Sequence, residues 1–439
     1  MTERIIINKK IRDFNKKINI SGDKSLSIRW VLFASLASGV SKSKHLLMSE
    51  DILAAINAIK KLGIKVKFKK DVCEIYGMGI NGYKYKKNLT INAENSGTLG
   101  RLILGLLINT PYPIRLIGDK SLSKRDFKRI SDPLSIFGAN FKLTNNKNLP
   151  LKIYGSPKLK PIKYIEARGS AQCKSSVIFA GMRTDGTTYI KAKKSRNHTE
   201  LLCKYLKLPI KIKEKKKYDL IEVKKINKVT PLNYNIPSDL SSSSFFMVLT
   251  ALAKNSKLLI KNVNINPSRT GIISILKRMG VKIILKNQKS YKGEKNADIF
   301  IRSSKKLKSI NCPTKFNSGA IDEFLLIFLV AAKAEGVSYF KNLEELNQKE
   351  SPRLIWGSKI LNQLGVKNII TKSSIKIFGN PNLNISHKIT IKNYFKDHRV
   401  FMTSVIAALS FGGNWKIHDR DSLNTSFPKF MNIINELQK

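Results

Sequence analysis

An internal repeat constrains this chain more than any other feature of its sequence. A helical pattern that ends in an apolar residue and glycine, followed by a β-rich run, appears at residues 51–64, 131–139, 270–281 and 353–366. Gly63, Gly138, Gly280 and Gly365 stand where a left-handed residue would stop each helix. Variant copies occur at 198–210, where Leu-Pro replaces the glycine step, and at 427–439. Repetition at this spacing is typical of a fold built from one recurring supersecondary unit.

A second element precedes each copy, and it is an apolar helical segment that opens with small polar residues. The six segments are 25–36, 96–107, 170–180, 241–252, 321–332 and 397–409. Their polar starts favour helix caps, and their apolar content predicts buried helices. The repeated unit is therefore strand, buried helix, strand, amphipathic helix, strand. Because 439 residues suit two domains, we expect an α/β fold with three units in each. The alternative is an ordinary α/β chain with coincidental spacing.

The net charge of +51 favours a nucleic-acid or anionic-membrane binder at first sight. However, 65 of the 81 basic residues are lysines that are spread along the whole chain, and only 16 are arginines. Arginine is the better reader of base edges and phosphates, so a dedicated recognition surface should contain more of it. We therefore interpret most of the charge as compositional drift and a solvated surface. A true polyanion partner stays open as the alternative.

Other classes of protein are disfavoured by simple absences in the sequence. No secretory segment opens the chain and no stretch of 18 apolar residues occurs, which predicts a cytoplasmic protein without a membrane span. Cys73, Cys173, Cys203 and Cys312 are far apart and form no CxxC pair. The five histidines show no paired spacing. We therefore expect neither a disulfide framework nor a metal site.

Polar motifs gather at the starts of the predicted buried helices. Seven of the 16 arginines lie in or near these motifs: Arg29, Arg101, Arg125, Arg196, Arg269, Arg353 and Arg399. In so lysine-rich a chain, a retained arginine indicates a need for the guanidinium fork, which binds carboxylate or phosphate in a bidentate manner. Free N–H groups at helix starts also favour anions. Capping or a structural ion pair is the alternative, and it stays open for Arg101 and Arg269.

The motifs, taken in order, resemble those of the enolpyruvyl transferase superfamily, and within it the EPSP synthase family. The resemblance covers essentially the whole chain. It rests on Lys24-Ser25 with Arg29, Asn95-x-Gly-Thr98 with Arg101, Ser170-Ala-Gln172, Asp322, Lys349-Glu350 with Arg353, and Asp397-His-Arg399. Ser121-Leu122 with Arg125, and 424–428, look more like the second sequence class of this family. The departures are Asp23, Ile28, Asp126, Ser238 and Pro352, and none of them replaces a residue of the chemistry.

The resemblance implies a two-domain inside-out α/β barrel, or prism, of six repeats. Residues 22–234 would form the shikimate 3-phosphate domain, and residues 1–21 with 235–439 the phosphoenolpyruvate domain, with the active site in the cleft between them. The implied reaction transfers the enolpyruvyl group of phosphoenolpyruvate to the 5-hydroxyl of shikimate 3-phosphate and releases phosphate. It would serve the shikimate pathway to chorismate and aromatic amino acids. It needs no metal or organic cofactor, and the implied protein is a cytoplasmic monomer whose partners are these small anionic substrates.

The resemblance also assigns roles to individual residues. Phosphoenolpyruvate would be held by Lys24, Gly97, Arg125, Lys349, Arg353 and Arg399. Shikimate 3-phosphate would be held by Lys24, Ser25, Arg29, Ser170, Ala171, Gln172, Arg196 and Asp322. The expected catalytic residues are Asp322 as base for the 5-hydroxyl, Glu350 as proton donor to the methylene carbon, and Lys24, which shares either role. Helix capping is the alternative for both carboxylates.

Three other functions remain to be compared with this one. The first is the related enzyme that transfers enolpyruvyl to UDP-N-acetylglucosamine, which normally has a Lys-Asn pair and a loop cysteine. Here the pair is Lys24-Ser25, and the loop 118–125 has no cysteine. The second is a basic nucleic-acid-binding protein, and the third is an inactive relative.

Overall fold

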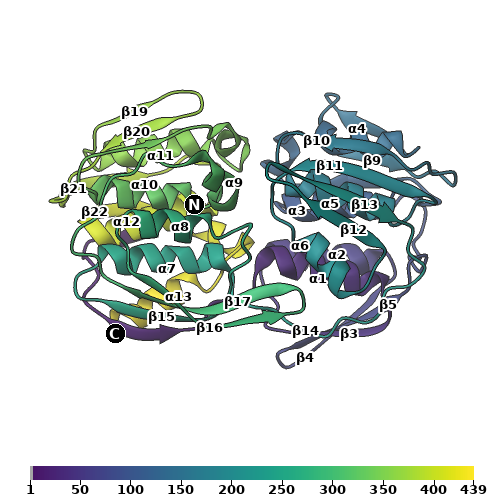
Figure 1. Cartoon of the computed structure of the whole chain (residues 1–439), viewed down its shortest axis with the longest axis horizontal. Coiled ribbons are helices and arrows are strands. Elements are labelled where there is room, and N and C mark those ends of the chain that lie inside the picture. Colours follow the sequence, from purple (N-terminus) through teal and green to yellow (C-terminus); the bar gives the residue numbers. More distant parts are fainter. Residues whose placement is uncertain (1–2) are drawn as a thin grey trace. The chain divides into compact units, whose positions relative to one another are not determined.

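The computed structural model describes residues 3–439, and the contacts within the chain divide it into two compact units (Figure 1). Unit 1 comprises the chain up to Ser21 with Pro237–Ser290 and Lys295–Lys439. Unit 2 comprises Gly22–Ile236 with Tyr291–Glu294. The chain therefore passes between the units at four points. The sequence pattern does not predict the two passages that flank Tyr291–Glu294.

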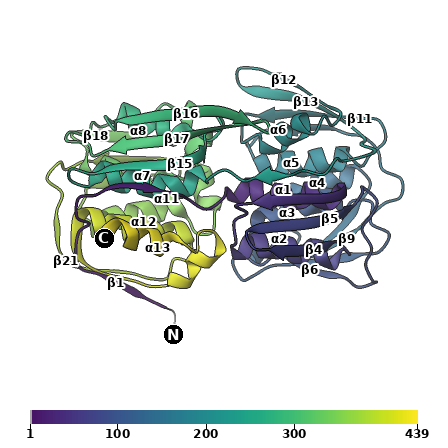
Figure 2. The same cartoon turned by 90° about the horizontal axis from the view of Figure 1, so that it is seen from below.

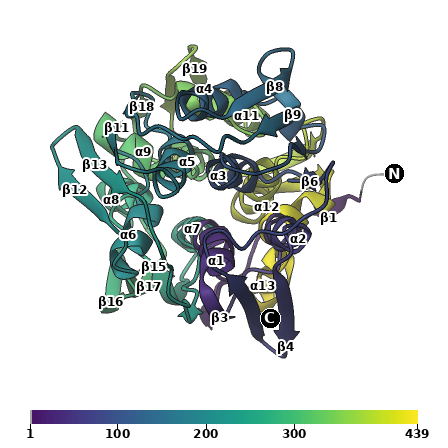
Figure 3. The ribbon, with the colours of Figure 1, turned by 90° about the vertical axis from the view of Figure 1, so that its right-hand side faces the viewer.

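Unit 2 consists of three sheets, each accompanied by one inner and one outer helix. The inner helices are α1 (Lys24–Leu36), α3 (Gly97–Leu106) and α5 (Ala171–Gly181), and the outer ones are α2 (Glu50–Lys61), α4 (Lys128–Ile136) and α6 (His198–Tyr205). Figure 3 shows the inner helices in the middle of the unit, with the sheets outside them. Because the inner helices are enclosed by sheets and other helices, nearly all their side chains are buried, as the apolar sequence predicts.

The sheets of unit 2 have the orders β14-β3-β5-β4, β6-β7-β9-β8 and β10-β11-β13-β12. Their strands are β3 (Ser38–Lys44), β4 (Lys65–Lys69), β5 (Val72–Met78), β6 (Thr90–Asn92), β7 (Ile114–Ile117), β8 (Asn140–Thr144), β9 (Asn148–Tyr154), β10 (Lys163–Glu166), β11 (Thr187–Lys193), β12 (Ile210–Glu214), β13 (Tyr218–Lys224) and β14 (Tyr234–Asn235).

Unit 1 repeats this plan. Its inner helices are α7 (Leu240–Leu252), α10 (Phe324–Lys333) and α12 (His398–Phe411), and its outer ones are α8 (Gly271–Arg278), α11 (Arg353–Gln363) and α13 (Phe430–Gln438). A short helix, α9 (Asn317–Ala320), precedes α10. The sheet orders are β16-β17-β15-β2, β18-β20-β19 and β1-β22-β21. The strands are β1 (Ile5–Ile7), β2 (Asn15–Ile18), β15 (Lys257–Asn264), β16 (Ile283–Tyr291), β17 (Glu294–Arg302), β18 (Val337–Phe340), β19 (Asn368–Ile370), β20 (Ile375–Phe378), β21 (Ile385–Ile391) and β22 (Gly412–Ile417).

The two units exchange the strands that open their first repeats. Strand β2 precedes α1 in the sequence, yet it pairs in parallel with β15 of unit 1. Strand β14 precedes α7, yet it pairs in parallel with β3 of unit 2. The N-terminal β1 pairs antiparallel with β22, and Figure 2 shows this purple strand among the yellow C-terminal elements. Both ends of the chain therefore complete the same unit.

The repeat predicted from the sequence is confirmed with one addition. The observed inner and outer helices begin within three residues of the predicted segments, and the four stop glycines have positive φ angles of 67° to 115°. Between the outer helix and the next repeat, however, most repeats contain a hairpin rather than one strand. In the first repeat Lys70, with φ of 49°, makes the turn between β4 and β5 without a glycine, so the sequence carries no clear break there. Among the described residues, no helix is long and apolar enough to cross a membrane.

Candidate active site

Three helix starts in unit 2 bring together most of the site residues predicted for that part of the chain. Asp23, Ser96 and Ser170 each cap one inner helix by accepting the backbone N–H three residues further on, at 2.9 to 3.3 Å. The caps satisfy one N–H group per helix, and the positive end of each helix dipole still favours an anion. Asp23 is thus a buried helix cap, which gives this departure from the family motif a structural role.

Lys24 and Arg29 on α1 have different surroundings. The Lys24 ammonium lies 3.0 Å from the Asp51 carboxylate, and its side chain is 22% exposed. Arg29 is only 2% exposed and donates to the Thr199 hydroxyl at 2.8 Å, to the Ser25 carbonyl at 3.0 Å and to the Ser175 hydroxyl at 3.2 Å. Burial lowers the pKa of Arg29 to about 10, although nearby carboxylates oppose the shift. Arg29 therefore holds the start of α1 in place through buried hydrogen bonds to Ser25 of the same helix and to Ser175 and Thr199 of the neighbouring helices.

Gly97, at the first position of α3, is packed against two guanidinium groups. A Cβ atom added there would lie 2.9 Å from Arg125 Nη1 and 3.0 Å from Arg101 Nη1. Arg101 is held in place because it donates to Gln172 Oε1 at 2.6 Å and stacks over the ring of Phe127 at 5.3 Å. Arg125 is half-buried in the segment after the 3₁₀ turn Leu122–Lys124. The glycine thus allows both cations to approach the same helix start.

Gln172 joins α5 to α3 rather than standing alone at its helix start. Its amide oxygen accepts from Arg101, and its amide nitrogen donates to the Thr98 hydroxyl at 3.0 Å. Arg101 therefore makes at least one structural contact, because its guanidinium holds the Gln172 side chain. Arg196, in the loop before α6, is half-buried, and its charge lies near enough to Arg29 to lower the pKa of that residue.

The loop that leads into α5 differs from the sequence-based expectation. The backbone N–H groups of Gly169 and Ser170 donate to the carboxylate of the buried Glu166, at 2.6 and 2.9 Å. Burial raises the pKa of Glu166, although these N–H bonds oppose the rise. The Ser170 N–H is therefore already hydrogen-bonded to Glu166 in this structure. The hydroxyl of Ser170, which only accepts from Cys173, keeps its own proton for an anion.

The first turn of α6 contains a polar network that sequence reasoning missed. Lys174 and Glu200 form an ion pair of 2.6 Å in which both side chains are almost completely buried. His198 Nδ1 lies 2.7 Å from Glu294 Oε1, and neither side chain is exposed. Thr199 donates to Ser175 at 2.8 Å. The only available sequence signal was the motif 195–200, from which Arg196 alone was selected.

In unit 1, Arg353 is the centre of the predicted acid–base residues. Its Nε and Nη2 donate to both oxygens of the fully buried Asp397 at 2.9 and 3.2 Å, its Nη1 to Asp322 at 3.3 Å, and its Nη2 also to Glu350. Burial alone would lower the pKa of Arg353, but the three carboxylates raise it above its ordinary value. Lys349 lies 3.3 Å from the same Asp322 oxygen. The structure therefore brings together Asp322, Lys349, Glu350 and Arg353, and these four residues are called the Arg353 cluster below.

Asp322 and Glu323 are neighbours with different environments. Glu323 is 2% exposed, accepts from Ser241 and occupies the cap position of α10 without a capping bond. Asp322 is half-buried, faces Lys349 and Arg353, and makes no cap. The capping alternative is therefore wrong for Asp322. Glu350 likewise lies before α11 and contacts Arg353 instead of capping.

The side chains of Arg399 and Arg353 are less exposed to solvent than their predicted roles as phosphoenolpyruvate ligands suggest. Arg399 donates to the Asp322 backbone carbonyl at 2.9 Å and is 9% exposed, whereas Arg353 is 2% exposed with four donations to carboxylates. In this structure Arg353 orders the carboxylates around it instead of facing solvent. Arg269 is also structural, because it is buried and donates to Ser241 at 2.8 Å and to Asp239 at 3.3 Å.

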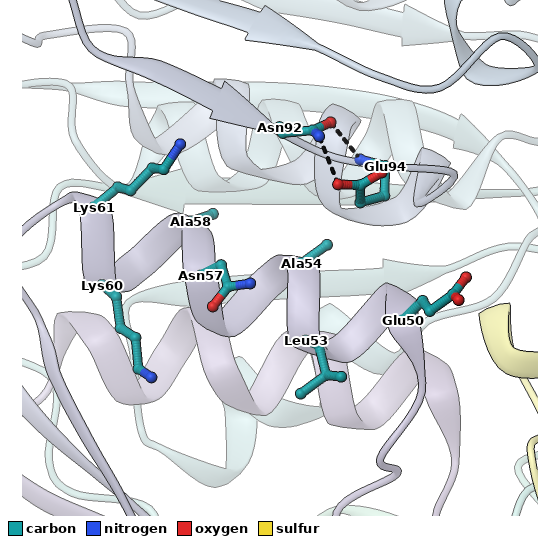
Figure 4. A pocket seen from close by; sticks show the side chains of 9 residues that line it. All are labelled: Glu50, Leu53, Ala54, Asn57, Ala58, Lys60, Lys61, Asn92 and Glu94. Atoms are coloured by element: carbon teal, nitrogen blue, oxygen red, sulfur yellow. Dashed lines mark hydrogen bonds between the residues drawn. The ribbon is translucent and has the colours of Figure 1, made fainter.

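A cavity of about 660 Å³ lies elsewhere on unit 2, along α2 and the end of β6 (Figure 4). Its lining includes Glu50, Leu53 and Lys61, and none of the predicted site residues lines it. Asn92 and Glu94 on its far side bond to each other, with the Glu94 N–H donating to the Asn92 side chain at 2.9 Å.

Comparisons with known proteins agree along the whole chain. Residues 8–434 match the family model described as EPSP synthase (3-phosphoshikimate 1-carboxyvinyltransferase). The 3-phosphoshikimate 1-carboxyvinyltransferase of Ruthia magnifica is 39% identical over 96% of this chain and 94% of its own length. That of Caldicellulosiruptor bescii is 36% identical, with 96% of each chain covered. The solved EPSP synthase of Acinetobacter baumannii superposes with a TM-score of 0.87 at 33% identity, over 99% of this chain and 98% of that one. The enolpyruvyl transferase NikO of Streptomyces tendae, at 14% identity and a TM-score of 0.78 over 100% of this chain and 98% of that one, shares the fold.

Proposed function

The chain belongs to the EPSP synthase (3-phosphoshikimate 1-carboxyvinyltransferase) family, and we propose that the helix-start residues of unit 2 and the Arg353 cluster of unit 1 each supply half of its active site. The protein is a transferase of the shikimate pathway. It transfers the enolpyruvyl group of phosphoenolpyruvate to the 5-hydroxyl of shikimate 3-phosphate, with release of phosphate.

Binding in unit 2 follows from the charge of the substrates. Both are anions, and two like unit charges at about 4 Å repel by roughly 4 kcal/mol at an effective dielectric of 20, so fixed cations are required. Shikimate 3-phosphate is held by Ser25, the Ser170 hydroxyl, the start of α5 at Ala171, and Gln172 and Arg196. Arg29 holds Ser25 and α5 in position beneath them, which its three hydrogen bonds support. Lys24 contacts both substrates in this proposal.

Phosphoenolpyruvate is held by cations from both units in this proposal. Arg125 beside Gly97 comes from unit 2, and Lys349 with Arg399 comes from unit 1. Arg353 acts differently from the sequence-based assignment, because it contacts carboxylates on all sides. Arg353 can bind phosphoenolpyruvate only if it gives up one of these carboxylate partners. The hydrogen bond from Arg353 to Asp322, at 3.3 Å, is the longest of them and would be the first to be exchanged.

The chemical steps are assigned to the two half-buried carboxyl groups Asp322 and Glu350. Asp322 accepts the proton of the 5-hydroxyl of shikimate 3-phosphate while the oxygen of that hydroxyl bonds to C2 of phosphoenolpyruvate. Glu350 delivers a proton to the methylene carbon, and the result is a tetrahedral adduct. Glu350 then takes a proton back from the new methyl group while the C2–O bond to phosphate breaks. Lys24 shares the proton transfer at the bridging oxygens. The proton held by Asp322 passes to the departing phosphate, so the products are the enolpyruvyl ether and hydrogen phosphate, and both carboxyl groups return to their starting protonation states.

The observation that carries this assignment is the convergence of Asp322 and Glu350 on the buried guanidinium of Arg353, with the Lys349 ammonium 3.3 Å from the same Asp322 oxygen. The test measures phosphate release from phosphoenolpyruvate plus shikimate 3-phosphate, with UDP-N-acetylglucosamine as the control acceptor. Asp322→Ala and Glu350→Ala should fold and lose turnover by about 10²–10⁴-fold, the range of general acid–base catalysis. The matched control is Glu344→Ala, which removes an exposed carboxylate in the 3₁₀ turn Glu344–Gln348. Near-full activity in either variant would remove that residue from its role.

We further propose that the protein acts as a monomer in the cytoplasm. Each unit has its own hydrophobic core, and the N-terminal strands β1 and β2 complete unit 1 of the same chain. Light scattering at micromolar concentration tests the monomer. A stable dimer mass would refute it.

A further inference from the structure

We propose that Glu294 is a positioning residue for shikimate 3-phosphate, acting through His198 on the loop that carries Arg196. The inference rests on the proposed function, because it assigns an indirect role in binding that substrate. It begins with the tip of one hairpin, Tyr291–Glu294, which belongs to unit 2 although the strands β16 and β17 form a sheet with β15 and β2 of unit 1.

The hairpin tip is packed tightly against α6 and β14. Tyr291 accepts the backbone N–H of Asn235 at 3.1 Å, and Lys292 donates to the Tyr205 hydroxyl at 2.8 Å. Gly293 approaches the backbone so closely that an added Cβ would lie 2.8 Å from the Leu201 carbonyl oxygen. These contacts leave little freedom for the tip.

The bond between Glu294 and His198 is the deepest of the tip contacts. The Glu294 carboxylate and the His198 ring are both fully buried, 2.7 Å apart. A buried carboxylate is costly unless it is paired and hydrogen-bonded. Lys292 at the same tip is half-buried and its bond to Tyr205 is exposed, so the tip also has a surface contact that does not depend on this buried pair.

The first turn of α6 connects the bond between Glu294 and His198 to α1 and α5. His198 contacts the hairpin tip, Thr199 accepts from Arg29 of α1, and Glu200 pairs with Lys174 of α5. These three consecutive residues therefore join the hairpin to both helices whose starts hold shikimate 3-phosphate. Arg196 lies two residues before His198, in the loop that enters this turn. Fixing His198 thus fixes the direction in which the loop that carries Arg196 enters α6.

This arrangement joins the substrate loop to the other unit through continuous chain. Glu294 is the first residue of β17, which pairs with β15 of unit 1. Glu294 therefore stands between β17 in the chain and His198 in space. Packing alone would be disturbed equally by changes at any point of the tip, whereas a positioning role depends on this one hydrogen bond.

The experiment compares five forms of the full-length protein by calorimetric titration with shikimate 3-phosphate and by steady-state kinetics. They are the wild type, Glu294→Ala, Glu294→Gln, His198→Asn and Lys292→Ala. Gln keeps an acceptor at Oε1, and Asn keeps a nitrogen where Nδ1 lies, so both conservative variants retain the bond. Lys292→Ala is the matched control, since it removes a contact of the same tip without touching His198. Thermal melts establish that each form is folded at the assay temperature.

Glu294→Ala should weaken shikimate 3-phosphate binding by about tenfold or more, with KM for phosphoenolpyruvate changed by less than about threefold. Both conservative variants should restore most of the affinity, and Lys292→Ala should match the wild type. The proposal is overturned if Glu294→Ala binds normally, if the conservative variants are as weak as alanine, or if Lys292→Ala is equally weak. Should alanine fail to fold, Glu294→Gln and His198→Asn still decide the matter, because loss of binding in those folded variants overturns it. Failure of the wild type to bind or turn over would instead refute the proposed function.

Discussion

Asp397 offers a quantitative test of how the Arg353 cluster is held together. Five donations converge on its buried carboxylate: Arg353 Nε at 2.9 Å and Nη2 at 3.2 Å, the Ser351 N–H at 3.2 Å and hydroxyl at 2.8 Å, and the Arg399 N–H at 2.9 Å. Asp397→Asn keeps the size of the side chain but replaces one acceptor oxygen with a donor. In either orientation, the new amide faces an N–H of Arg353.

The expected loss in the free energy of unfolding follows from the positive charge of Arg353, which stays buried after Asp397 is replaced. Removing one partner of a buried ion pair costs about 3–5 kcal/mol. Because Arg353 keeps Asp322 and Glu350, we take the lower end, about 3 kcal/mol. For a unit of this size, the corresponding fall in melting temperature is about 6–12 °C. Turnover should also fall, since Asp322 and Glu350 are positioned by the same guanidinium.

The assay is urea denaturation followed by the tryptophans of unit 1, Trp356 and Trp415, which are both buried. The matched control is Asp421→Asn, which loses an ion pair with Lys396 in which both side chains are more than a third exposed. Such pairs contribute about 0–1 kcal/mol. If Asp397→Asn falls within about 0.5 kcal/mol of this control, the reasoning that places Asp397 at the base of the cluster is refuted.

Two further predictions concern other parts of the molecule. Gly97→Ala should raise KM for phosphoenolpyruvate about tenfold, with a smaller effect on KM for shikimate 3-phosphate, because the new methyl group displaces Arg125. Steady-state kinetics with each substrate varied in turn measure both values. A larger rise in KM for shikimate 3-phosphate than for phosphoenolpyruvate would contradict the reasoning. Asp298 should stabilise unit 1 only above acid pH: burial alone would raise its pKa, but bonds from Lys261 and from the Asn262 N–H lower it below 3.8. Its contribution is therefore present at pH 7 and lost as pH falls through the lowered pKa, so denaturation of Asp298→Asn should show a deficit at pH 7 that shrinks below about pH 3.8. A deficit of equal size at both pH values would contradict it.

The helices and their repetition could be predicted because they depend on local chemistry. The caps Asp23, Ser170 and Asp397 and the stop glycines act within a few residues of themselves, and the apolar segments report burial directly. The arginines among the predicted site residues were selected for a related reason, since arginines in a lysine-rich chain mark positions where the guanidinium geometry is needed, whereas the other site residues were assigned from the family resemblance.

The contacts that order the site could not be predicted in this way. Glu166, Glu200 and Glu294 are buried carboxylates whose partners are N–H groups or side chains determined by packing. Their sequence surroundings do not differ from those of solvated glutamates, so composition and periodicity carry no signal for them. The same holds for Arg353, which looks like a substrate ligand in the sequence and contacts carboxylates in the structure.

The sequence by itself determined the sixfold α/β repeat, the inner helices and the residue types at their starts, because caps, stops and hydrophobic periodicity act over one or two turns. Only the tertiary structure decided which strands complete which unit, that β2 and β14 are exchanged between the first repeats, and that Glu294 meets His198. Strand pairing and buried ion pairs join residues far apart in the chain, and their free energy exists only when the whole unit is packed.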